Sequence, residues 1–211
     1  MKINEIFKSI QGESIYMGTP TLFIRTAGCN LRCTYCDTKY AYNEGKEISV
    51  DELLNIVDSF GMEYVEITGG EPLLQKDTPV LIERLLDKGY KVIVETSGSQ
   101  DIGLIKEGAM IVMDLKCPSS GESKKNNWRN IDRLKKDDQV KFVIGTREDY
   151  EWAKRIIEKC RLIEKAVVLM SVVYEKLKPE VLIKWILEDN LRVRFQPQLH
   201  KLIWGANIRG K

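Results

Sequence analysis

Short apolar runs rich in β-branched residues alternate with amphipathic segments along almost the whole chain. Several of these runs are continuously apolar, as in parallel strands that are covered on both faces. Repeated strand–helix alternation predicts an α/β fold with a parallel sheet and right-handed crossovers. The predicted strands span residues 21–25, 64–68, 91–95, 110–114, 140–144, 166–171 and 192–195.

The segments between the predicted strands carry helix-start signals. Ser49, three residues ahead of Glu52, makes a capping-box pattern before an apolar stripe. Thr78 precedes a proline at the start of a second pattern, Thr146 is placed to cap a third, and Pro179 suits the first turn of a fourth. The sequence therefore predicts four main helices between the strands.

Chain length limits whether the predicted parallel sheet can close into a complete barrel. With 211 residues the chain is short for eight complete strand–helix units, so we expect a partial, open parallel β/α barrel. No repeat or linker divides the sequence, which favours a single domain over residues 1–211. Residues 118–127 are polar and are predicted to form a loop that could be mobile.

The overall charge and hydropathy exclude several classes of protein. There are 33 basic and 31 acidic residues, a net charge of +2, so no strong field favours direct binding of a nucleic acid. No apolar run is long enough to cross a bilayer, and the charged start lacks the apolar centre of a secretion signal. We predict a cytoplasmic protein without a membrane partner, in which cysteine thiols stay reduced.

Three of the five cysteines are crowded into eight residues directly after the first predicted strand. Cys29, Cys33 and Cys36 have the spacing C-x3-C-x2-C, and thiolates in one short loop suit a compact thiophilic metal centre. A structural zinc site or an electron-transfer cluster normally has four protein ligands. Either a distant side chain supplies the fourth, or one position is open for the amino and carboxylate groups of a bound methionine moiety. The distant candidates are Cys117, Cys160 and His200.

The cysteine spacing resembles that of the radical S-adenosylmethionine (SAM) superfamily. Residues 68–72 (TGGEP) resemble its GGEP motif, in which two glycines permit close backbone approach and Glu71 could help to hold an ammonium group. Further motifs along nearly the whole chain resemble the 7-carboxy-7-deazaguanine synthase (QueE) family. These motifs are residues 7–14 (FKSIQGES), 23–28 (FIRTAG), 36–38 (CDT), 95–98 (ETSG), 114–121 (DLKCPSSG) and 198–205 (QLHKLIWG).

That resemblance implies a carbon–nitrogen lyase that converts 6-carboxy-5,6,7,8-tetrahydropterin to 7-carboxy-7-deazaguanine with loss of ammonia. It implies a [4Fe–4S] cluster on the three cysteines, SAM and Mg²⁺ as cofactors. SAM would be cleaved to a 5′-deoxyadenosyl radical that takes a hydrogen from C6 of the pterin, and would then be regenerated. The product would serve queuosine, archaeosine or another deazapurine of tRNA modification, which the sequence does not distinguish. A flavodoxin- or ferredoxin-type electron donor and a homodimer are the family expectation.

The resemblance also carries residue roles. Thr38 would ligate Mg²⁺, and the planar cation of Arg25 suits a substrate carboxylate. The substrate contacts implied are Ile10, Gln11, Gly12, Arg25 and Thr96. The SAM contacts implied are Tyr35, Cys36, Asp37, Gly69, Gly70, Glu71, Gly98, Asp114, Leu115 and Lys116. Other members carry Ser-Pro-Lys in place of Asp114-Leu115-Lys116, which leaves the contacts of that segment open.

The remaining candidates have simpler interpretations. Cys117 is expected beside the pocket as a spectator, Cys160 as a buried apolar residue of a helix, and His200 either as a donor to substrate or as a structural side chain. A competing enzyme class is a glycyl-radical activase, which shares the cysteine spacing. A competing non-enzymatic class is a zinc or iron–sulfur module for electron transfer or interaction.

Overall fold

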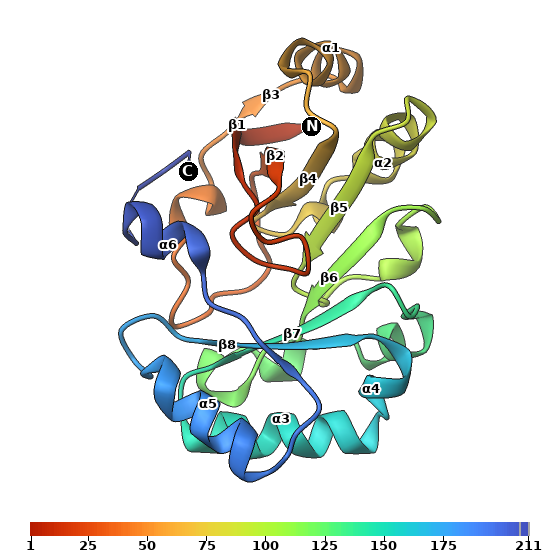
Figure 1. The fold of residues 1–211 in the computed structure, drawn as a ribbon. Helices are drawn as coiled ribbons and strands as arrows, with labels where there is room; N and C mark the ends of the chain where they lie inside the picture. Colours follow the sequence, from red (N-terminus) through yellow and green to blue (C-terminus); the bar gives the residue numbers. More distant parts are fainter. Residues whose placement is uncertain (207, 211) are drawn as a thin grey trace.

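The structure, a computed structural model, describes residues 1–206 and 208–210. Within these residues the strands form one sheet of order β3-β1-β2-β4-β5-β6-β7-β8-β9. Figure 1 shows this sheet curving around an open centre, with α1, α2, α3 and α5 along its outer side. The strands are β1 (Lys2–Ile10), β2 (Pro20–Thr26), β3 (Lys46–Glu47), β4 (Tyr64–Gly69), β5 (Lys91–Thr96), β6 (Met110–Asp114), β7 (Gln139–Ile144), β8 (Val167–Val172) and β9 (Arg194–Phe195).

The helices lie between the strands as the start signals predict. Ser49 accepts a hydrogen bond from the Glu52 amide at 3.2 Å, and Thr146 forms a complete capping box with Asp149. Pro179 occupies the first turn of the fourth predicted helix. The α-helices are α1 (Val50–Phe60), α2 (Thr78–Asp87), α3 (Arg147–Lys159), α4 (Leu162–Lys165), α5 (Pro179–Glu188) and α6 (Leu199–Trp204). The 3-10 helices are η1 (Lys39–Tyr42), η2 (Pro72–Leu74), η3 (Ile102–Leu104), η4 (Pro118–Ser120), η5 (Ser123–Lys125) and η6 (Trp128–Arg133).

Strand β2 and the strands β4 to β9 pair in parallel, which confirms the predicted open α/β barrel. The first strand, β1, corrects the prediction, which did not include it. β1 runs antiparallel to both β2 and β3 and was not predicted, because its polar residues interrupt the apolar run expected of a covered parallel strand. The cysteine segment therefore follows the second strand of the chain, and the TGGEP segment follows the fourth.

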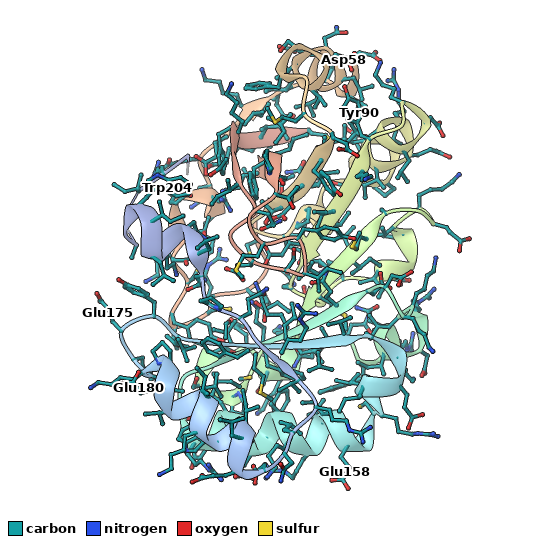
Figure 2. All side chains as sticks on the ribbon, in the orientation of Figure 1. Asp58, Tyr90, Glu158, Glu175, Glu180 and Trp204 are labelled. Carbon is teal, nitrogen blue, oxygen red and sulfur yellow. The ribbon has the colours of Figure 1, made fainter. Side chains whose placement is uncertain are left out.

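Two apolar clusters fill the space between the sheet and the outer helices. One joins β2, β4 and β5 to α1 and α2, and the other joins β6, β7 and β8 to α3 and α5. Each fully buried leucine or isoleucine contributes roughly 1.5–3 kcal/mol. Side chains fill these layers in Figure 2, where the Tyr90 hydroxyl beyond α2 donates to the Asp58 carboxylate of α1 at 2.7 Å. The strand residues in these clusters face the outer helices. Because side chains alternate along a strand, the residues between them point toward the concave face of the sheet.

The predicted mobile loop at residues 118–127 is instead a folded segment. It forms η4 and η5, and it buries Ser120 and Asn126. The Asn126 side chain accepts from the Lys116 amide at 2.9 Å and donates to the Lys116 carbonyl at 3.0 Å. The polar composition suggested an exposed loop, but the Ser120 and Asn126 side chains are buried and bind backbone groups. Among the described residues, no helix has both the length and the apolar character that crossing a bilayer requires.

Candidate active site

The cysteine loop, residues 28–38, begins at the carboxyl end of β2. All three of its thiols are half-buried, and the Cys36 amide donates to the Cys33 carbonyl at 3.2 Å. Burial raises the pKa of Cys33 to about 11 and also raises that of Cys29. A bound metal centre would reverse this effect, because coordination favours the thiolate.

The arrangement of donors bears on which metal centre fits. Among the described residues, no three His, Cys, Asp or Glu side chains converge as ligands of one metal ion. A cubane cluster has a different requirement, because each of its thiolates binds a different iron atom. Three cysteines on one short loop, without a fourth cysteine beside them, fit a [4Fe–4S] cluster with one iron left for another ligand.

The GGE turn, residues 69–71, lies directly against the cysteine loop. The Gly70 amide donates to the Thr26 carbonyl at 3.1 Å, and the Glu71 amide donates to the Gly28 carbonyl at 2.8 Å. A Cβ at Gly70 would overlap that same Gly28 carbonyl, and Gly69 has a φ of 147°. Both glycines are therefore required for the turn to meet the cysteine loop, which places the two radical SAM motifs side by side.

The Glu71 side chain is held by donors from the protein itself. Its carboxylate is 0% exposed and accepts from the Leu73 amide at 3.0 Å and the Ser97 amide at 2.8 Å. The Thr96 hydroxyl also donates to it, at 2.8 Å. Since these donors occupy the carboxylate from inside the protein, Glu71 ties the GGE turn to the end of β5. An ammonium ligand would instead meet the backbone of the turn.

Thr96 and Gly98, which follow β5, complete this corner. Thr96 is buried, and its hydroxyl proton is engaged by the Glu71 carboxylate. Gly98 has a φ of 68°, and a Cβ there would lie 2.8 Å from Cγ of Met113. Its carbonyl accepts from the Asn127 amide and the Asn130 side chain, both at 3.0 Å. Gly98 is thus required by packing against β6.

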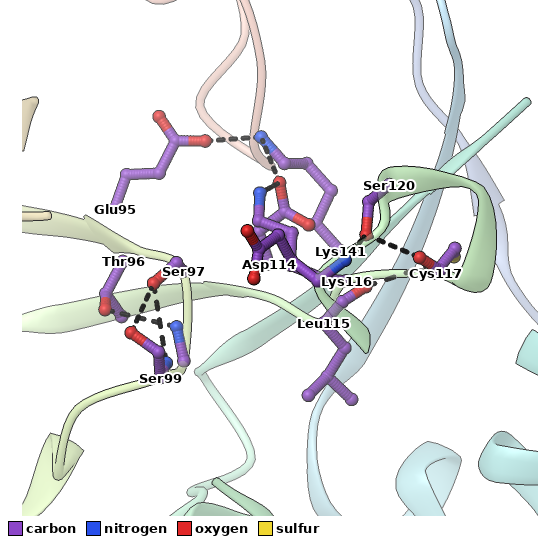
Figure 3. Close-up of polar contacts among 12 residues, drawn as sticks. Glu95, Thr96, Ser97, Ser99, Asp114, Leu115, Lys116, Cys117, Ser120 and Lys141 are labelled. Atoms are coloured by element: carbon purple, nitrogen blue, oxygen red, sulfur yellow. Dashed lines mark hydrogen bonds and ion pairs between the residues drawn. The ribbon is translucent and has the colours of Figure 1, made fainter. Parts of the chain in front are cut away.

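Asp114, Leu115 and Lys116 leave β6 beside the cysteines. The Lys116 ammonium lies 2.8 Å from Oδ2 of Asp114, as Figure 3 shows. Burial opposes its charge, but Asp114 and then Cys33 raise the Lys116 pKa above its usual range. The Leu115 side chain is fully buried and its amide donates to the Lys141 carbonyl at 2.9 Å. Of the three, Lys116 and Asp114 present opposite charges near the Cys33 thiol.

Two buried polar atoms next to this segment have no partner among the described residues. They are the Tyr35 hydroxyl and Oδ1 of Asp114. Burial, followed by Asp114, raises the Tyr35 pKa above its usual range. A buried polar atom without a partner is costly, and a polar ligand between the cysteine loop and β6 would satisfy both atoms. This observation fits SAM, whose methionine and ribose groups offer both donors and acceptors.

Charged side chains from four segments meet on the concave face. The Lys141 ammonium of β7 pairs with Glu95 of β5, and Oδ2 of Asp114 is 3.9 Å from it (Figure 3). The same ammonium pairs with Glu13 at 2.8 Å. The Lys141 side chain is only 6% exposed. We call this group, together with the buried Glu66 of β4, the concave ion network.

The network sets the protonation of its members. Burial opposes the charge of Lys141, but Glu13 and Glu95 raise its pKa well above the usual range. Burial likewise opposes ionisation of Glu13, yet Lys141 lowers its pKa to about 2. Burial, and then Glu95, raise the pKa of Glu66 well above that of an ordinary carboxyl. The concave face thus holds an ionised pair beside a carboxyl that favours its neutral form.

The sequence interpretation missed this network, apart from Asp114. Glu66, Glu95 and Lys141 are charged residues in the middle of otherwise apolar strands. That interruption was the available signal, because a charge in a covered strand is expensive unless it has a partner. Glu13 lies inside the FKSIQGES motif, but nothing in its spacing indicated Lys141 as its partner.

The connection from β1 to β2 carries the predicted substrate residues. Gln11 is 3% exposed; its side-chain nitrogen donates to Glu66, and its side-chain oxygen accepts from the Glu13 amide at 3.1 Å. Gly12 lies so close to the His200 ring that a Cβ there would overlap it. Ile10 ends β1 opposite Pro20. The structure thus brings these residues to the concave face, with the Gln11 amide already engaged.

Arg25 lies farther along the same face, at the β1–β2 end. Its Nε is 2.7 Å from Oε1 of Glu5, and its guanidinium carbon is 5.8 Å from the centre of the Phe7 ring. The Tyr40 hydroxyl donates to the same Glu5 oxygen at 3.0 Å. Glu5 and Tyr40 were not singled out from the sequence. Glu5 binds the Nε side of the Arg25 guanidinium group, and Tyr40 holds Glu5 in position.

Thr38 is the N-cap residue before η1, and its hydroxyl donates to the Asp37 carboxylate at 2.9 Å. The other oxygen of Asp37 lies 2.6 Å from the Lys201 ammonium of α6. Burial opposes ionisation, but Lys201 lowers the Asp37 pKa to about 2. The predicted Mg²⁺ residue thus lies beside an ionised carboxylate, at the junction of the cysteine loop and α6.

The three residues left open by the sequence are now placed. Burial lowers the pKa of His200, whose ring packs on Gly12, so the neutral imidazole is favoured. Cys117 is fully buried, and burial raises its pKa well above the usual range. Neither cysteine lies in the cysteine loop. Cys160 was predicted to be a buried residue of a helix, but it is only half-buried and lies at the end of α3.

Comparison with known proteins defines the class first. The profile of the radical SAM superfamily matches residues 23–180, which include both the cysteine loop and the GGE turn. Together with the open parallel sheet, this match shows that the chain is a radical SAM protein.

The relatives define the family within that class. The chain is 40% identical over 225 residues to the 7-carboxy-7-deazaguanine synthase of Koribacter versatilis, covering 100% of each chain. It is 43% identical over 204 residues to the synthase of the same name from Methanospirillum hungatei, covering 96% of this chain and 85% of that one. The chain therefore belongs to the 7-carboxy-7-deazaguanine synthase family.

Solved structures agree on the fold. The crystal structure of QueE from Escherichia coli matches with a TM-score of 0.76 at 23% identity, covering 92% of this chain and 93% of that one. SuiB from Streptococcus suis, in a structure bound to S-adenosylmethionine, matches with a TM-score of 0.58 at 16% identity and covers 85% of this chain but 51% of that one. The similarity to SuiB is thus limited to part of the larger protein.

Proposed function

We propose that the chain converts 6-carboxy-5,6,7,8-tetrahydropterin to 7-carboxy-7-deazaguanine with loss of ammonia. The names of its full-length relatives support this activity. One geometric observation carries it in this structure: the opening and closing motifs of the family meet. The Leu199 amide donates to the Gly12 carbonyl at 2.9 Å, and the Gln198 side chain donates to Glu13 at 2.8 Å. Motifs from the two ends of the chain thus line one side of the concave face.

In this proposal the cysteine loop and its neighbours hold the cofactors. Cys29, Cys33 and Cys36 bind the cluster, and the GGE-turn backbone, Lys116 and the unpartnered Tyr35 hydroxyl face the polar groups of SAM. When bound, the cluster and SAM supply the radical chemistry. The residues implied for SAM from the sequence keep that assignment, with Glu71 and Gly98 acting through the backbone they position.

The concave ion network and Arg25 orient the substrate. Arg25 offers the unpaired edge of its fork to the substrate carboxylate. Gln11, Gly12 and Ile10 form the wall against the heterocycle, and Thr96 closes the side next to the GGE turn. Lys141 lies between this wall and the SAM side, so it can place a positive charge near the reacting ring without giving up its proton. Exclusion of water by these packed segments protects a reactive intermediate.

The proposal includes five further elements. Mg²⁺ binds at Thr38, which the adjacent ionised Asp37 supports by its charge. Residues 1–211 act as one radical SAM domain, since one sheet joins all nine strands of the described residues. A homodimer, a cytoplasmic location and a flavodoxin- or ferredoxin-type electron donor follow the family resemblance.

An anaerobic assay tests the activity directly. Iron-loaded protein is incubated with the carboxypterin, SAM and dithionite, and the products are identified by mass spectrometry. We expect 7-carboxy-7-deazaguanine and ammonia in equal amounts, dependent on SAM. Cys29→Ala should lose both the cluster absorption and the product. SAM cleavage without any deazaguanine product would retain the radical SAM class and refute this substrate.

A further inference from the structure

Exposed cations gather beside the cysteine loop on a segment that the proposed catalytic machinery does not use. Residues 117–131 contain three basic residues and one acidic residue, although the whole chain is almost balanced in charge. Lys124, Lys125 and Arg129 are exposed, and so is Arg32 within the cysteine loop. We call these four residues the basic face. None of them forms an ion pair within residues 1–206 and 208–210.

This segment is attached to the cysteine loop by several contacts. The Arg32 amide donates to the Glu122 carboxylate at 2.7 Å, the Thr34 amide donates to the Ser120 carbonyl at 3.0 Å, and the Thr34 hydroxyl donates to the Ser119 carbonyl at 2.8 Å. Glu122 is the one acidic residue of the segment, and its carboxylate is engaged by this loop. The basic face is therefore held next to the three cysteines.

Some exposed lysines elsewhere on the surface have carboxylate partners. Lys91 pairs with Glu63 at 2.7 Å and Lys106 with Glu83 at 2.6 Å. The basic face lacks such partners and includes an exposed aromatic residue, since Trp128 is 43% exposed between Lys125 and Arg129. A cationic surface with an exposed tryptophan has the composition of a docking site for an acidic protein.

We propose that the basic face is the docking surface for an acidic one-electron carrier protein. The proposal rests on the proposed function, since only a redox cluster in the cysteine loop gives the docked carrier a target. In the transfer step one electron leaves the reduced carrier, which is oxidised, and enters the oxidised cluster, which is reduced. No bond forms or breaks, and no proton moves. Docking on the basic face brings the carrier next to the cysteine loop, to which this segment is hydrogen-bonded.

Charge reversal with a matched control tests the surface. The test variant is Lys124→Glu/Lys125→Glu. The control is Lys136→Glu/Lys159→Glu, whose exposed lysines precede β7 and β8 at the opposite end of the strands. Both variants change the net charge from +2 to −2, since two lysines become two glutamates. Any difference between them therefore reports position and not total charge.

The probe is an acidic flavodoxin, used with the iron-loaded protein. Calorimetry measures its dissociation constant, and stopped-flow absorbance measures cluster reduction by its reduced form. We expect the test variant to weaken binding about tenfold at low ionic strength and to slow reduction similarly. The control should stay within about twofold of the parent. The difference should shrink at high salt, because screening shortens the reach of exposed charges.

Other results separate the possible failures. Product formation driven by dithionite should be equal in all three proteins, and its absence from the parent protein would refute the proposed function alone. Equal weakening in both variants, or none in the test variant, would overturn the docking surface. It would also be overturned if the test variant lost affinity for single-stranded RNA and kept its affinity for the carrier.

Discussion

Two neighbouring parts of the site are built in opposite ways. The cysteine loop and the GGE turn are contiguous motifs joined by a backbone hydrogen bond, from the Glu71 amide to the Gly28 carbonyl. The concave ion network consists of single side chains from separate segments, as between Lys141 and Glu13, which are 128 residues apart. The backbones of the cysteine loop and the GGE turn are so close that an added side-chain atom would disturb them. The concave ion network depends instead on the balance of its charges. Loss of either part should therefore have a distinct signature.

Removal of the central cation should have the largest effect. Lys141→Met leaves Glu13, Glu95 and Asp114 close together without their shared cation. We expect a loss of about 3–5 kcal/mol in the free energy of unfolding, measured by chemical denaturation. Lys154→Met is the matched control, because its partner Asp189 is partly exposed, and it should cost at most about 1 kcal/mol. Equal losses would mean that the network is not a special feature.

The same variant should change the acid sensitivity of the protein. The pKa of Glu13 is lowered to about 2 in the folded state, so its ion pair stabilises the fold above the ordinary carboxyl pKa of 4.5. This contribution is lost as the pH falls from 4.5 toward 2. In Lys141→Met the decline of stability over that interval should become shallower, as measured by denaturation at a series of pH values.

The GGE turn should be sensitive to a single methyl group. In Gly70→Ala the new Cβ would overlap the Gly28 carbonyl and move the turn away from the cysteine loop. We expect activity to fall about 100-fold, since a small misplacement at a reacting centre has this effect. Gly61→Ala, at the end of α1, has a positive φ but no neighbour within 4 Å. It should cost about 1 kcal/mol of stability and leave SAM binding intact, measured by calorimetry.

Glu71→Gln should have an intermediate effect. An amide in place of the carboxylate turns one acceptor into a donor facing the Ser97 or Leu73 amide, which should cost about 1–3 kcal/mol of stability. SAM affinity should decrease only as far as the turn loosens. An unchanged unfolding curve combined with lost SAM binding would instead restore the direct ligand contact implied by the sequence.

Asp37→Asn should have the smallest effect. The Asp37–Lys201 ion pair joins the cysteine loop to α6, but the Asp37 side chain is 48% exposed. We therefore expect at most about 1 kcal/mol, measured by denaturation, with faster hydrogen exchange confined to α6. A loss larger than that of Glu71→Gln would show that the attachment of α6 matters more than its exposure suggests.

The contrast between the two parts also explains what the sequence could predict. Local signals were sufficient for β4, predicted over 64–68 and found over Tyr64–Gly69, and for the Thr146 cap of α3. They failed to predict β1, because polar residues interrupt its apolar run and nothing in its sequence indicates that it pairs antiparallel with β2. They did not indicate the partners of Glu71 either, since only the fold reveals that Thr96 and Ser97 occupy its carboxylate. The positions of motifs along the chain can be predicted from the sequence. The direction in which a side chain points cannot, because it depends on partners that are distant in the sequence.

The meeting of Gly12 with α6 implies an order of assembly. The cysteine loop, the GGE turn and the partners that hold them, which extend to Glu122, are synthesised well before Gln198 and Leu199. A nascent chain could therefore acquire iron and sulfide while the pterin side is still open, and the final helix would then complete the wall. The fold thus allows metallation from the solvent before the pocket is shut.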